Sequence, residues 1–412
     1  MSKKRVAVIG AGFSGLTIAW ILAKKNFEVE IFEASERTGG LIGTKHEGVL
    51  VEQAANAMLA NQNIENLLKE IGVTAVSAGY RSNKRWIFRS KPVTMPISIS
   101  GLTGGLLRLL FSFVSKKVKP QNGESLSAWA ERVLNKEFCT YLISPAFQGV
   151  YSTSAERLSA TLVIGSLFRK DLKSPKGELR GSISASGGMQ DIINGLTSNL
   201  KNKGVVIHTN ASVSLAELQT NFDATVVATS IGAAGNLLRD QAPLTASKIS
   251  KIPLLPLASV TLKFNSTKRV QGFGCLFPKP ENFSALGVLF PSDIFPNRGN
   301  NTETWITSDA TSPDADLLAA LAQDHGRLAG EKEDIERYFI KRWPKALPLY
   351  GVELENLLAE TDFAEGLLNG VRLSECKSAP LYLTGNYLGV IGLAKILDYN
   401  LRLGSRIEKE IL

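Results

Sequence analysis

The chain has 412 residues, of which 44% are hydrophobic and 21% are charged, and its formal net charge at pH 7 is +9. This length supports two or three packed units, and the composition excludes long disordered regions. Lysines and arginines are scattered rather than interleaved with aromatic residues, so we expect no nucleic-acid partner.

Cysteine and histidine usage argues against a metal site. The three cysteines, Cys139, Cys275 and Cys376, lie far apart in the sequence and form no Cys-x-x-Cys pair. Neither a zinc site nor a disulfide framework is indicated, and the usage is typical of a reducing compartment. The three histidines also lack metal-ligand spacing, so no metal is predicted. Because the first residues contain no apolar signal segment, we expect a cytoplasmic protein.

The first elements along the chain predict a strand–helix–strand unit. Residues 5–9 and 28–32 are short apolar runs typical of buried strands. Between them, residues 14–25 carry apolar side chains at helical spacing and end in two lysines, which complement the helix dipole. A strand followed by a helix and a second strand is the basic unit of a parallel sheet.

The turn in this unit has the glycine pattern of a dinucleotide site. Residues 10–15 read GAGFSG, which is GxGxxG after a strand and at the start of a helix. Gly10 permits the tight turn, Gly12 lets the backbone approach a pyrophosphate, and Gly15 lets the helix pack closely on the strand. Glu33, which ends the second strand, can accept hydrogen bonds from ribose hydroxyls and would repel the 2′-phosphate of NADP. The alternative is a glycine-rich turn without a ligand.

The residues after Glu33 favour FAD over NAD. The segment Glu36 to Gly40 reads ERTGG, and an Arg-x-Gly-Gly at this place resembles flavoproteins of the amine-oxidase superfamily. Arg37 can pair with a phosphate, and Gly39 and Gly40 let the chain pass close to the cofactor. The alternative is a surface turn.

The remaining elements indicate an α/β fold with a discontinuous Rossmann-type FAD-binding domain. Short apolar strands recur at residues 205–208, 224–228 and after residue 381, whereas residues 81–180 read as helical. We predict that the FAD-binding domain comes from residues 1–80, 181–240 and 374–412. It is interrupted by a helical insertion at residues 81–180 and by a mixed α+β segment at residues 241–373.

Within the insertion, residues 101–118 read as an amphipathic helix. Lys116, Lys117 and Lys119 follow its apolar side chains and are well placed for anionic headgroups. The apolar stretch is too short and interrupted for a spanning helix, which needs about 20 residues. We therefore expect peripheral association with the inner face of the cytoplasmic membrane; the alternative is an ordinary core helix. The apolar residues at helical spacing are Leu102, Leu106, Leu109, Leu110 and Phe113.

Read from end to end, the sequence resembles the oxygen-dependent protoporphyrinogen oxidase family. The resemblance implies FAD as cofactor, O₂ as acceptor and a porphyrinogen of haem synthesis as substrate. It also implies a fold with an FAD domain, a substrate domain at residues 241–373 and a helical membrane-binding domain at residues 81–180. The blocks that carry it are residues 49–53 with Asn56, residues 145–151 (PAFQGVY) with Leu158-Ser159, residues 187–190, residues 272–278 (GFGCLFP), residues 286–290 (LGVLF) with Phe295-Pro296, residues 342–344 with Pro348 and Tyr350, and residues 385–390.

The resemblance also places the cofactor and substrate residues. The flavin carries the chemistry, so we assign no catalytic side chain. Arg85 matches a position where family members place an arginine for a propionate, which a guanidinium can bind through two hydrogen bonds; the alternative is a surface arginine. The predicted cofactor-binding residues are Gly10, Gly12, Phe13, Ser14, Gly15, Glu33, Ala34, Arg37, Gly39, Gly40, Leu41, Ala55, Asn56, Val213, Trp343, Gly385, Asn386 and Val390.

Three departures from the family pattern leave the reaction open. Ala54-Ala55 stands where the family has Gly-Pro, Lys395 stands where an acid or a neutral group is usual, and residues 352–354 lack a histidine. The chain could oxidise protoporphyrinogen or coproporphyrinogen. It could instead be a divergent flavoprotein for another apolar substrate, or a flavin- or porphyrin-binding protein without turnover. A homo-oligomer is compatible with the sequence.

Overall fold

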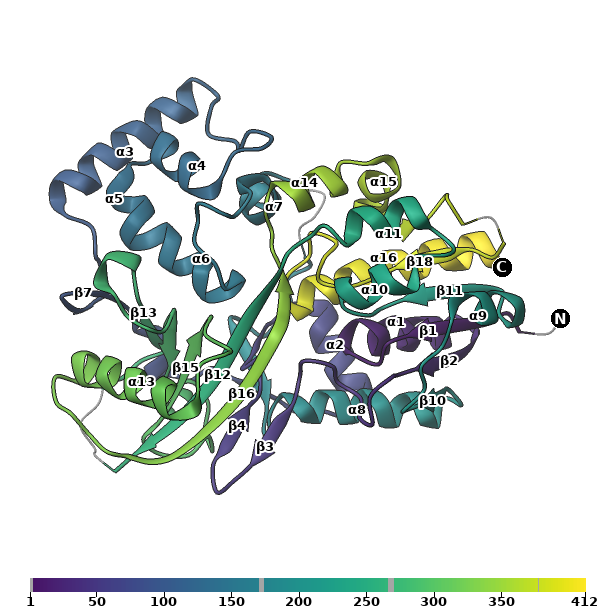
Figure 1. The fold of residues 1–412 in the computed structure, drawn as a ribbon, viewed down its shortest axis with the longest axis horizontal. Coiled ribbons are helices and arrows are strands. Elements are labelled where there is room, and N and C mark those ends of the chain that lie inside the picture. Colours follow the sequence, from purple (N-terminus) through teal and green to yellow (C-terminus); the bar gives the residue numbers. More distant parts are fainter. Residues whose placement is uncertain (1–2, 170–173, 266–269, 377) are drawn as a thin grey trace.

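The N-terminal strand–helix–strand unit belongs to a six-stranded sheet in which every neighbouring pair is parallel except β17 with β18. The structure, a computed structural model, describes residues 3–169, 174–265, 270–376 and 378–412. Segments far apart in sequence meet in this sheet, at the right of Figure 1. In sheet order the strands are β10 (Val206–His208), β2 (Glu28–Phe32), β1 (Arg5–Ile9), β11 (Ala224–Val227), β18 (Leu381–Leu383) and β17 (Val371–Arg372).

Helices pack around this sheet and bury its central strands. Strands β1, β11 and β18 are almost continuous aliphatic or aromatic runs and are buried, as is typical of parallel strands covered on both faces. Helix α1 contacts both α8 and α16. The helices are α1 (Phe13–Lys24), α2 (Gln62–Glu70), α8 (Met189–Asn202), α9 (Leu215–Asn221), α10 (Ile231–Leu237), α11 (Pro243–Ile249), α14 (Val352–Leu358), α15 (Thr361–Asn369) and α16 (Leu393–Ile411).

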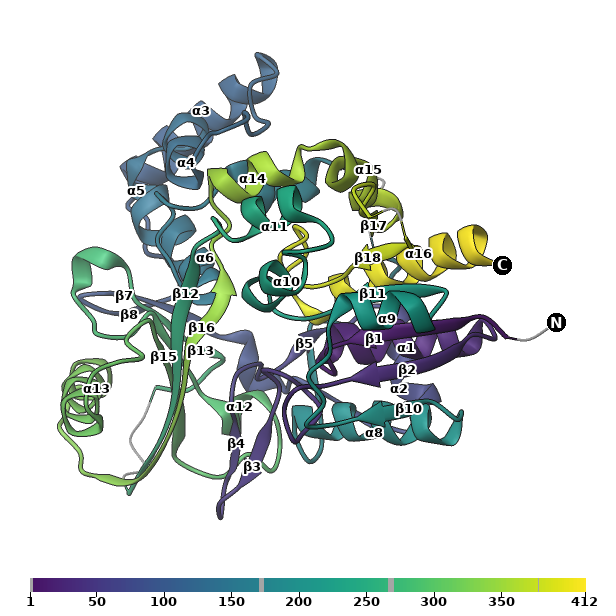
Figure 2. The ribbon, with the colours of Figure 1, turned by 45° about the vertical axis from the view of Figure 1, so that its right-hand side comes forward.

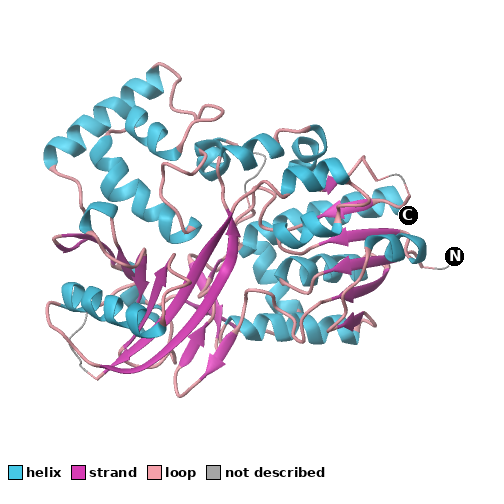
Figure 3. Cartoon of the chain, viewed as in Figure 1, coloured by secondary structure: helices cyan, strands magenta, loops and turns pink. Residues whose placement is uncertain are grey.

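A second, seven-stranded sheet is built on two long antiparallel strands, which are prominent in Figure 3. Its core is aromatic: the ring of Phe277 stacks on Phe283 and on the buried Trp305. Helix α13 (Asp314–Ala329) packs its leucines into the same core. In sheet order the strands are β16 (Ile335–Pro348), β12 (Leu254–Phe264), β15 (Thr302–Thr307), β14 (Gly287–Leu289), β13 (Gly274–Leu276), β7 (Arg85–Arg89) and β8 (Lys91–Val93).

Residues 85–93 correct the prediction that residues 81–180 are helical. They form β7 and β8, and β7 pairs in parallel with β13. Phe88 is buried among the aromatic rings of the second core, and this long-range packing, invisible in local periodicity, decides their structure. In the range predicted for the substrate domain, helices α11, α14 and α15 contribute side chains to the core of the first sheet. The boundaries of the three parts stay a prediction.

The rest of the insertion forms a helical layer, which Figure 2 shows beyond the ends of β12 and β16. It contains α3 (Ile99–Val114), α4 (Leu126–Val133), α5 (Lys136–Phe138), a π-helical turn (Cys139–Ile143), α6 (Ser144–Tyr151) and α7 (Ala160–Ile164). Two small sheets are formed by β3 (Thr44–His46) with β4 (Leu50–Glu52), and by β5 (Met58–Leu59) with β9 (Ser182–Ala185) and β6 (Ala75–Ser77). The remaining elements are the short helix α12 (Pro291–Ile294) and three 3₁₀ helices, Tyr80–Asn83, Gly165–Phe168 and Lys279–Glu281.

A buried asparagine ties the last helix to the first. Asn400 of α16 is fully buried, and its side-chain amide donates to the Ser14 carbonyl at 2.9 Å and to the Thr17 hydroxyl at 2.8 Å. Its carbonyl oxygen accepts from the hydroxyl of Thr384, which follows β18. Every polar atom of this amide is therefore used to fix α1 and α16 at the end of the sheet.

Candidate cofactor-binding site

A cavity of about 580 Å³ lies where the parallel strands of the first sheet end. The residues that follow β1, β2, β11 and β18 all contribute to its wall. Because the carboxyl ends of parallel strands meet at one edge of a sheet, loops from distant parts of the sequence converge there. Residues of β16 and the first residue of β12 also contribute, so the wall joins the two sheets.

The turn between β1 and α1 brings backbone N–H groups to the cavity. Gly10 has a φ of 102°, and its N–H donates to the Phe32 carbonyl at 2.7 Å. A Cβ on Gly15 would stand 1.8 Å from the carbonyl oxygen of Gly10, whereas a Cβ on Gly12 would meet nothing nearer than the Cα of Gly40, 4.0 Å away. The fold therefore requires glycine at position 15, and the open space at Gly12 is available to a ligand.

Glu33 follows β2 and is held by the same turn. One carboxylate oxygen accepts a hydrogen bond from the backbone N–H of Ala11 at 2.7 Å. The other accepts from the backbone N–H of Ser35 at 2.9 Å and from its hydroxyl at 2.6 Å. A carboxylate fixed on the cavity wall in this way can accept further hydrogen bonds from ribose hydroxyls.

A second glycine turn lies against the first. Gly39 and Gly40 have φ values of 114° and 60°, and Gly39 forms a backbone bridge with Gly12. The guanidinium of Arg37 donates to the carbonyls of Gly40 and Ile42, at 2.6 and 2.8 Å. Arg37 thus fixes the shape of the turn and is not among the described residues that line the cavity. Its pairing with a phosphate stays a prediction.

Most of the residues predicted to bind a cofactor line this cavity. These are Gly10, Gly12, Phe13, Ser14, Glu33, Ala34, Gly39, Gly40, Leu41, Val213, Gly385 and Asn386. The predicted residues that lie outside its wall are Gly15, Arg37, Ala55, Asn56, Trp343 and Val390.

Trp343 nevertheless contacts the segment that contains two of these outlying residues. Its indole N–H donates to the carbonyl of Gln53 at 2.8 Å. The side chain of Asn56 folds back and donates to the carbonyl of Ala54 at 3.1 Å. The fold therefore brings β16 together with residues 53–56.

Sequence reasoning missed several polar groups on the wall. Lys345 of β16 is the one cationic side chain among the described residues that line the cavity. It follows Trp343 by two positions, but the register of β16 against β12 shifts between Trp343 and Leu347, so strand alternation gave no signal for Lys345. Thr229, Ser230 and Asn236 follow β11 and carried no recognisable motif.

Arg85 lies apart from this cavity, on β7 near the far edge of the second sheet. Its guanidinium carbon stands 4.4 Å from the ring centre of Phe273, and the residue is exposed. Among the described residues no carboxylate pairs with it. Its cationic group is therefore free to bind an anion from outside the chain.

Lys395, the charged departure on α16, does not line the cavity either. Its Nζ lies 3.5 Å from the hydroxyl of Ser166, and the residue is exposed. The described residues also contain no cluster of His, Cys, Asp and Glu side chains that could hold a metal ion.

Comparisons with known proteins agree over nearly the whole chain. The family model described as flavin containing amine oxidoreductase matches residues 13–392. The mitochondrial protoporphyrinogen oxidase of Nicotiana tabacum is 26% identical, over 96% of this chain and 93% of the relative. The coproporphyrinogen III oxidase of Staphylococcus aureus is 25% identical, over 85% of this chain and 89% of the relative. A solved structure from Exiguobacterium sp. 255-15, named provisionally as a protoporphyrinogen oxidase, aligns over 100% of both chains with a TM-score of 0.78 and 17% identity.

The cofactor of this chain is FAD, and the residues present fit it. The open space at Gly12 and the N–H groups at the start of α1 suit a pyrophosphate, since a helix N-terminus favours anions. The fixed carboxylate of Glu33 suits the adenosine ribose.

The two glycines of the turn are expected to respond differently to substitution. Gly12→Val should retain no yellow FAD. Its melting temperature should be close to that of the unmodified protein without FAD, because the protein leaves room for a side chain there. Gly15→Ala should lower the melting temperature of the FAD-free protein, because its Cβ meets the Gly10 carbonyl. Absorption spectra and thermal melts of both variants check this. Normal FAD content in Gly12→Val would contradict the placement of the cofactor.

Proposed function

Because the chain belongs to the family of flavin containing amine oxidoreductases, we propose that this FAD-dependent oxidoreductase converts a porphyrinogen to the porphyrin with O₂ as acceptor, in haem synthesis. The observation that carries the proposal is the similarity to protoporphyrinogen oxidase over 96% of the chain. The cavity at the carboxyl ends of β1, β2, β11 and β18 supports it, because it offers FAD a preformed place.

FAD, when bound, supplies the redox chemistry, accepting the hydrogens removed from the ring and passing them to O₂. The chain's own residues bind and orient it. The backbone between Gly10 and Ser14 would carry the pyrophosphate, and Glu33 would hold the ribose. Trp343 and residues 53–56 would adjoin the flavin, and their mutual hydrogen bond keeps them in register.

Protein reconstituted with FAD is expected to produce fluorescent porphyrin and peroxide from a porphyrinogen in air-saturated buffer. Relatives named for each substrate match the chain, so both protoporphyrinogen and coproporphyrinogen are assayed, and the larger kcat/KM identifies the substrate. The FAD-free Gly12→Val variant controls for spontaneous oxidation.

Two results would contradict the proposed reaction. Tight binding of a porphyrinogen without turnover above the control would favour a flavin- and porphyrin-binding protein. Failure to bind either porphyrinogen would favour a divergent enzyme with another apolar substrate.

Arg85 is proposed to bind a carboxylate arm of the porphyrinogen. Arg85→Ala is expected to raise KM more than it lowers kcat, because a clamp remote from the reacting carbons holds ground state and transition state equally. A charge-assisted hydrogen bond contributes about 1.5–3 kcal/mol, which predicts a roughly ten- to hundredfold loss of kcat/KM. The exposed Arg180, which donates to a carbonyl of its own loop and does not line the cavity, provides a control as Arg180→Ala. A change of less than twofold in Arg85→Ala would remove Arg85 from the site.

Helix α3 is proposed to rest on an anionic membrane surface. It exposes a continuous apolar face, with Leu107 68% and Phe111 72% exposed, and buries Gly105 and Ser112 instead. The predicted face was shifted, because Leu102 and Leu109 are only half-exposed whereas Leu107, Phe111 and Val114 are exposed. This exposure supports the membrane surface over the alternative of an ordinary core helix. In the part of the chain that the structure describes, no helix is long and apolar enough to cross a membrane.

The double variant Leu107→Asp/Phe111→Asp is expected to lose binding to phosphatidylglycerol-containing vesicles, because it places two charges in the apolar face. Vesicle flotation measures this, with Leu244→Asp/Leu412→Asp as a control in exposed leucines outside α3. Binding that survives the α3 changes, or no binding by the unmodified protein, would reject the membrane surface. The cytoplasmic location stays a prediction.

A further inference from the structure

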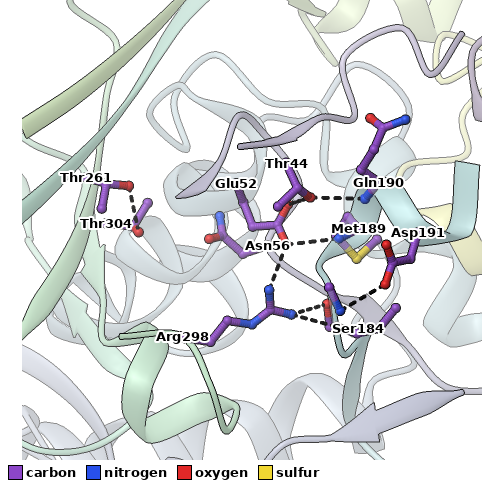
Figure 4. A network of polar contacts seen from close by, with 12 residues as sticks. Thr44, Glu52, Asn56, Ser184, Met189, Gln190, Asp191, Thr261, Arg298 and Thr304 are labelled. Carbon is purple, nitrogen blue, oxygen red and sulfur yellow. Dashed lines mark hydrogen bonds and ion pairs between the residues drawn. The ribbon is translucent and has the colours of Figure 1, made fainter. Parts of the chain in front are cut away.

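Glu52 and Arg298 form a buried ion pair between the two sheets, which Figure 4 shows from close by. Glu52 ends β4 and Arg298 follows α12, and they are only 5% and 3% exposed. The Nη1 of Arg298 lies 3.2 Å from an oxygen of Glu52. Two charges withdrawn from water are costly unless their remaining hydrogen-bonding groups also find partners.

Those partners are present on the Glu52 side. One oxygen also accepts from the backbone N–H of Met189, at the start of α8, at 2.9 Å. The other accepts from the hydroxyl of Thr44 at 2.7 Å, and this hydroxyl oxygen accepts from the N–H of Gln190 at 3.0 Å. The carboxylate is thus the meeting point of β3, β4 and α8.

Arg298 connects the loop after α12 to β9. Its Nη2 donates to the hydroxyl of Ser184 at 2.7 Å and to the carbonyl of Ala185 at 3.0 Å. The guanidinium therefore fixes the loop after α12 to the small sheet beside α8 (Figure 4).

The network extends to the wall of the FAD cavity. Residues 39–42 line the cavity, and Thr44, which Glu52 holds, begins the strand that follows them. The residue after Glu52 is also held at this point, because the N–H of Gln53 donates to the carbonyl of Gly43 at 2.8 Å. A change in the Glu52 side chain would therefore shift the backbone of the second glycine turn.

The same stretch of backbone is held by the second sheet. The Ser259 hydroxyl of β12 lies 3.4 Å from the carbonyl oxygen of Glu52. One residue later, Trp343 of β16 donates to the carbonyl of Gln53. The side chain of Glu52 thus holds the strand next to the cavity wall, and its backbone carbonyl contacts the second sheet.

We propose that the Glu52–Arg298 pair is a positioning device that holds residues 39–44 and residues 53–56 in the arrangement the flavin requires. The inference rests on the proposed function only in placing FAD in this cavity. Neither Glu52 nor Arg298 is among the described residues that line the cavity, so the pair would act through the backbone that it fixes.

The pKa values of Glu52 and Arg298 indicate that the ion pair positions the backbone around it rather than stabilising the fold. Burial raises the pKa of Glu52 to about 7, and Asp191 of α8, which faces both groups, adds to this. Burial also lowers the pKa of Arg298. Because Glu52 holds its proton more tightly in the folded protein, its contribution to stability is full below about pH 4.5 and is lost as the pH rises through about 7. The pair with Glu52 ionised is therefore less stable than the pair with Glu52 protonated.

Three variants separate positioning from a merely structural role. Glu52→Gln keeps the shape and one acceptor oxygen but loses the charge and replaces the other oxygen by an NH₂ donor. Arg298→Met loses the guanidinium, and the double variant leaves neither charge unpaired. Each is titrated with FAD as the apoprotein, and its flavin spectrum and melting temperature are recorded. Glu336→Gln, which breaks the more exposed pair with Lys263 inside the second sheet, is the control and should change none of these.

We expect Glu52→Gln to weaken FAD binding about tenfold, the effect of one charge-assisted hydrogen bond, and to shift the flavin absorption band. Above pH 7, Arg298→Met should lower the melting temperature, because it leaves the Glu52 charge unpaired, and the double variant should recover the melting temperature without recovering the FAD affinity or the spectrum. If it recovers all three, or if the single variants bind FAD normally with an unchanged spectrum, the positioning role is overturned.

The pH dependence gives an independent readout that needs no turnover. The unmodified protein should bind FAD more tightly above pH 7 than at pH 5.5, while its stability moves in the opposite direction. Glu52→Gln should show the weaker affinity at every pH. A variant that keeps the pH dependence of the unmodified protein would contradict the assignment to Glu52. Since these measurements concern FAD alone, failure of porphyrinogen turnover would leave their result intact.

Discussion

The backbone of Gly12 lies against the backbone of Gly39 and Gly40, and this contact between two glycine turns determines where a cofactor can lie. Gly15 lets α1 approach the end of β1, and Gly12 leaves the space in front of the helix empty. Side chains at these positions would either break the turn or fill the cavity. The six-stranded sheet supplies the converging loops, and Asn400 fixes α1 and α16 behind them. The site is thus largely made of backbone, which suits a cofactor that carries its own chemistry.

The two sheets have different tasks in this arrangement. The first sheet presents N–H groups and the Glu33 carboxylate, whereas the second contributes β12 and β16 to the wall and continues through β7, where Arg85 lies. The cavity therefore depends on how the sheets are held together. Hydrogen bonds from Trp343 and Ser259 and the buried pair of Glu52 with Arg298 cross this junction.

Local patterns in the sequence were enough to predict the glycine turns, Glu33 and the parallel sheet, because each depends on residues close in sequence and on strand periodicity. They were not enough for β7 and β8, whose structure depends on pairing with β13, almost two hundred residues away. Arg37 matched a motif, but its guanidinium is used by carbonyls of its own turn. Arg298 carried no motif, and only the fold brings it to Glu52. The apolar face of α3 was predicted in outline, but which side is exposed depends on how the helix packs.

The proposed reaction requires FAD in this cavity to take hydrogens from a porphyrinogen. It is tested by an anaerobic mixing experiment, in which the absorbance of protein-bound FAD is followed after addition of protoporphyrinogen or coproporphyrinogen. We expect the yellow band to bleach as porphyrin appears, and we expect O₂ to restore the band. An FAD band that stays unchanged while a porphyrinogen is bound would contradict the proposed reaction.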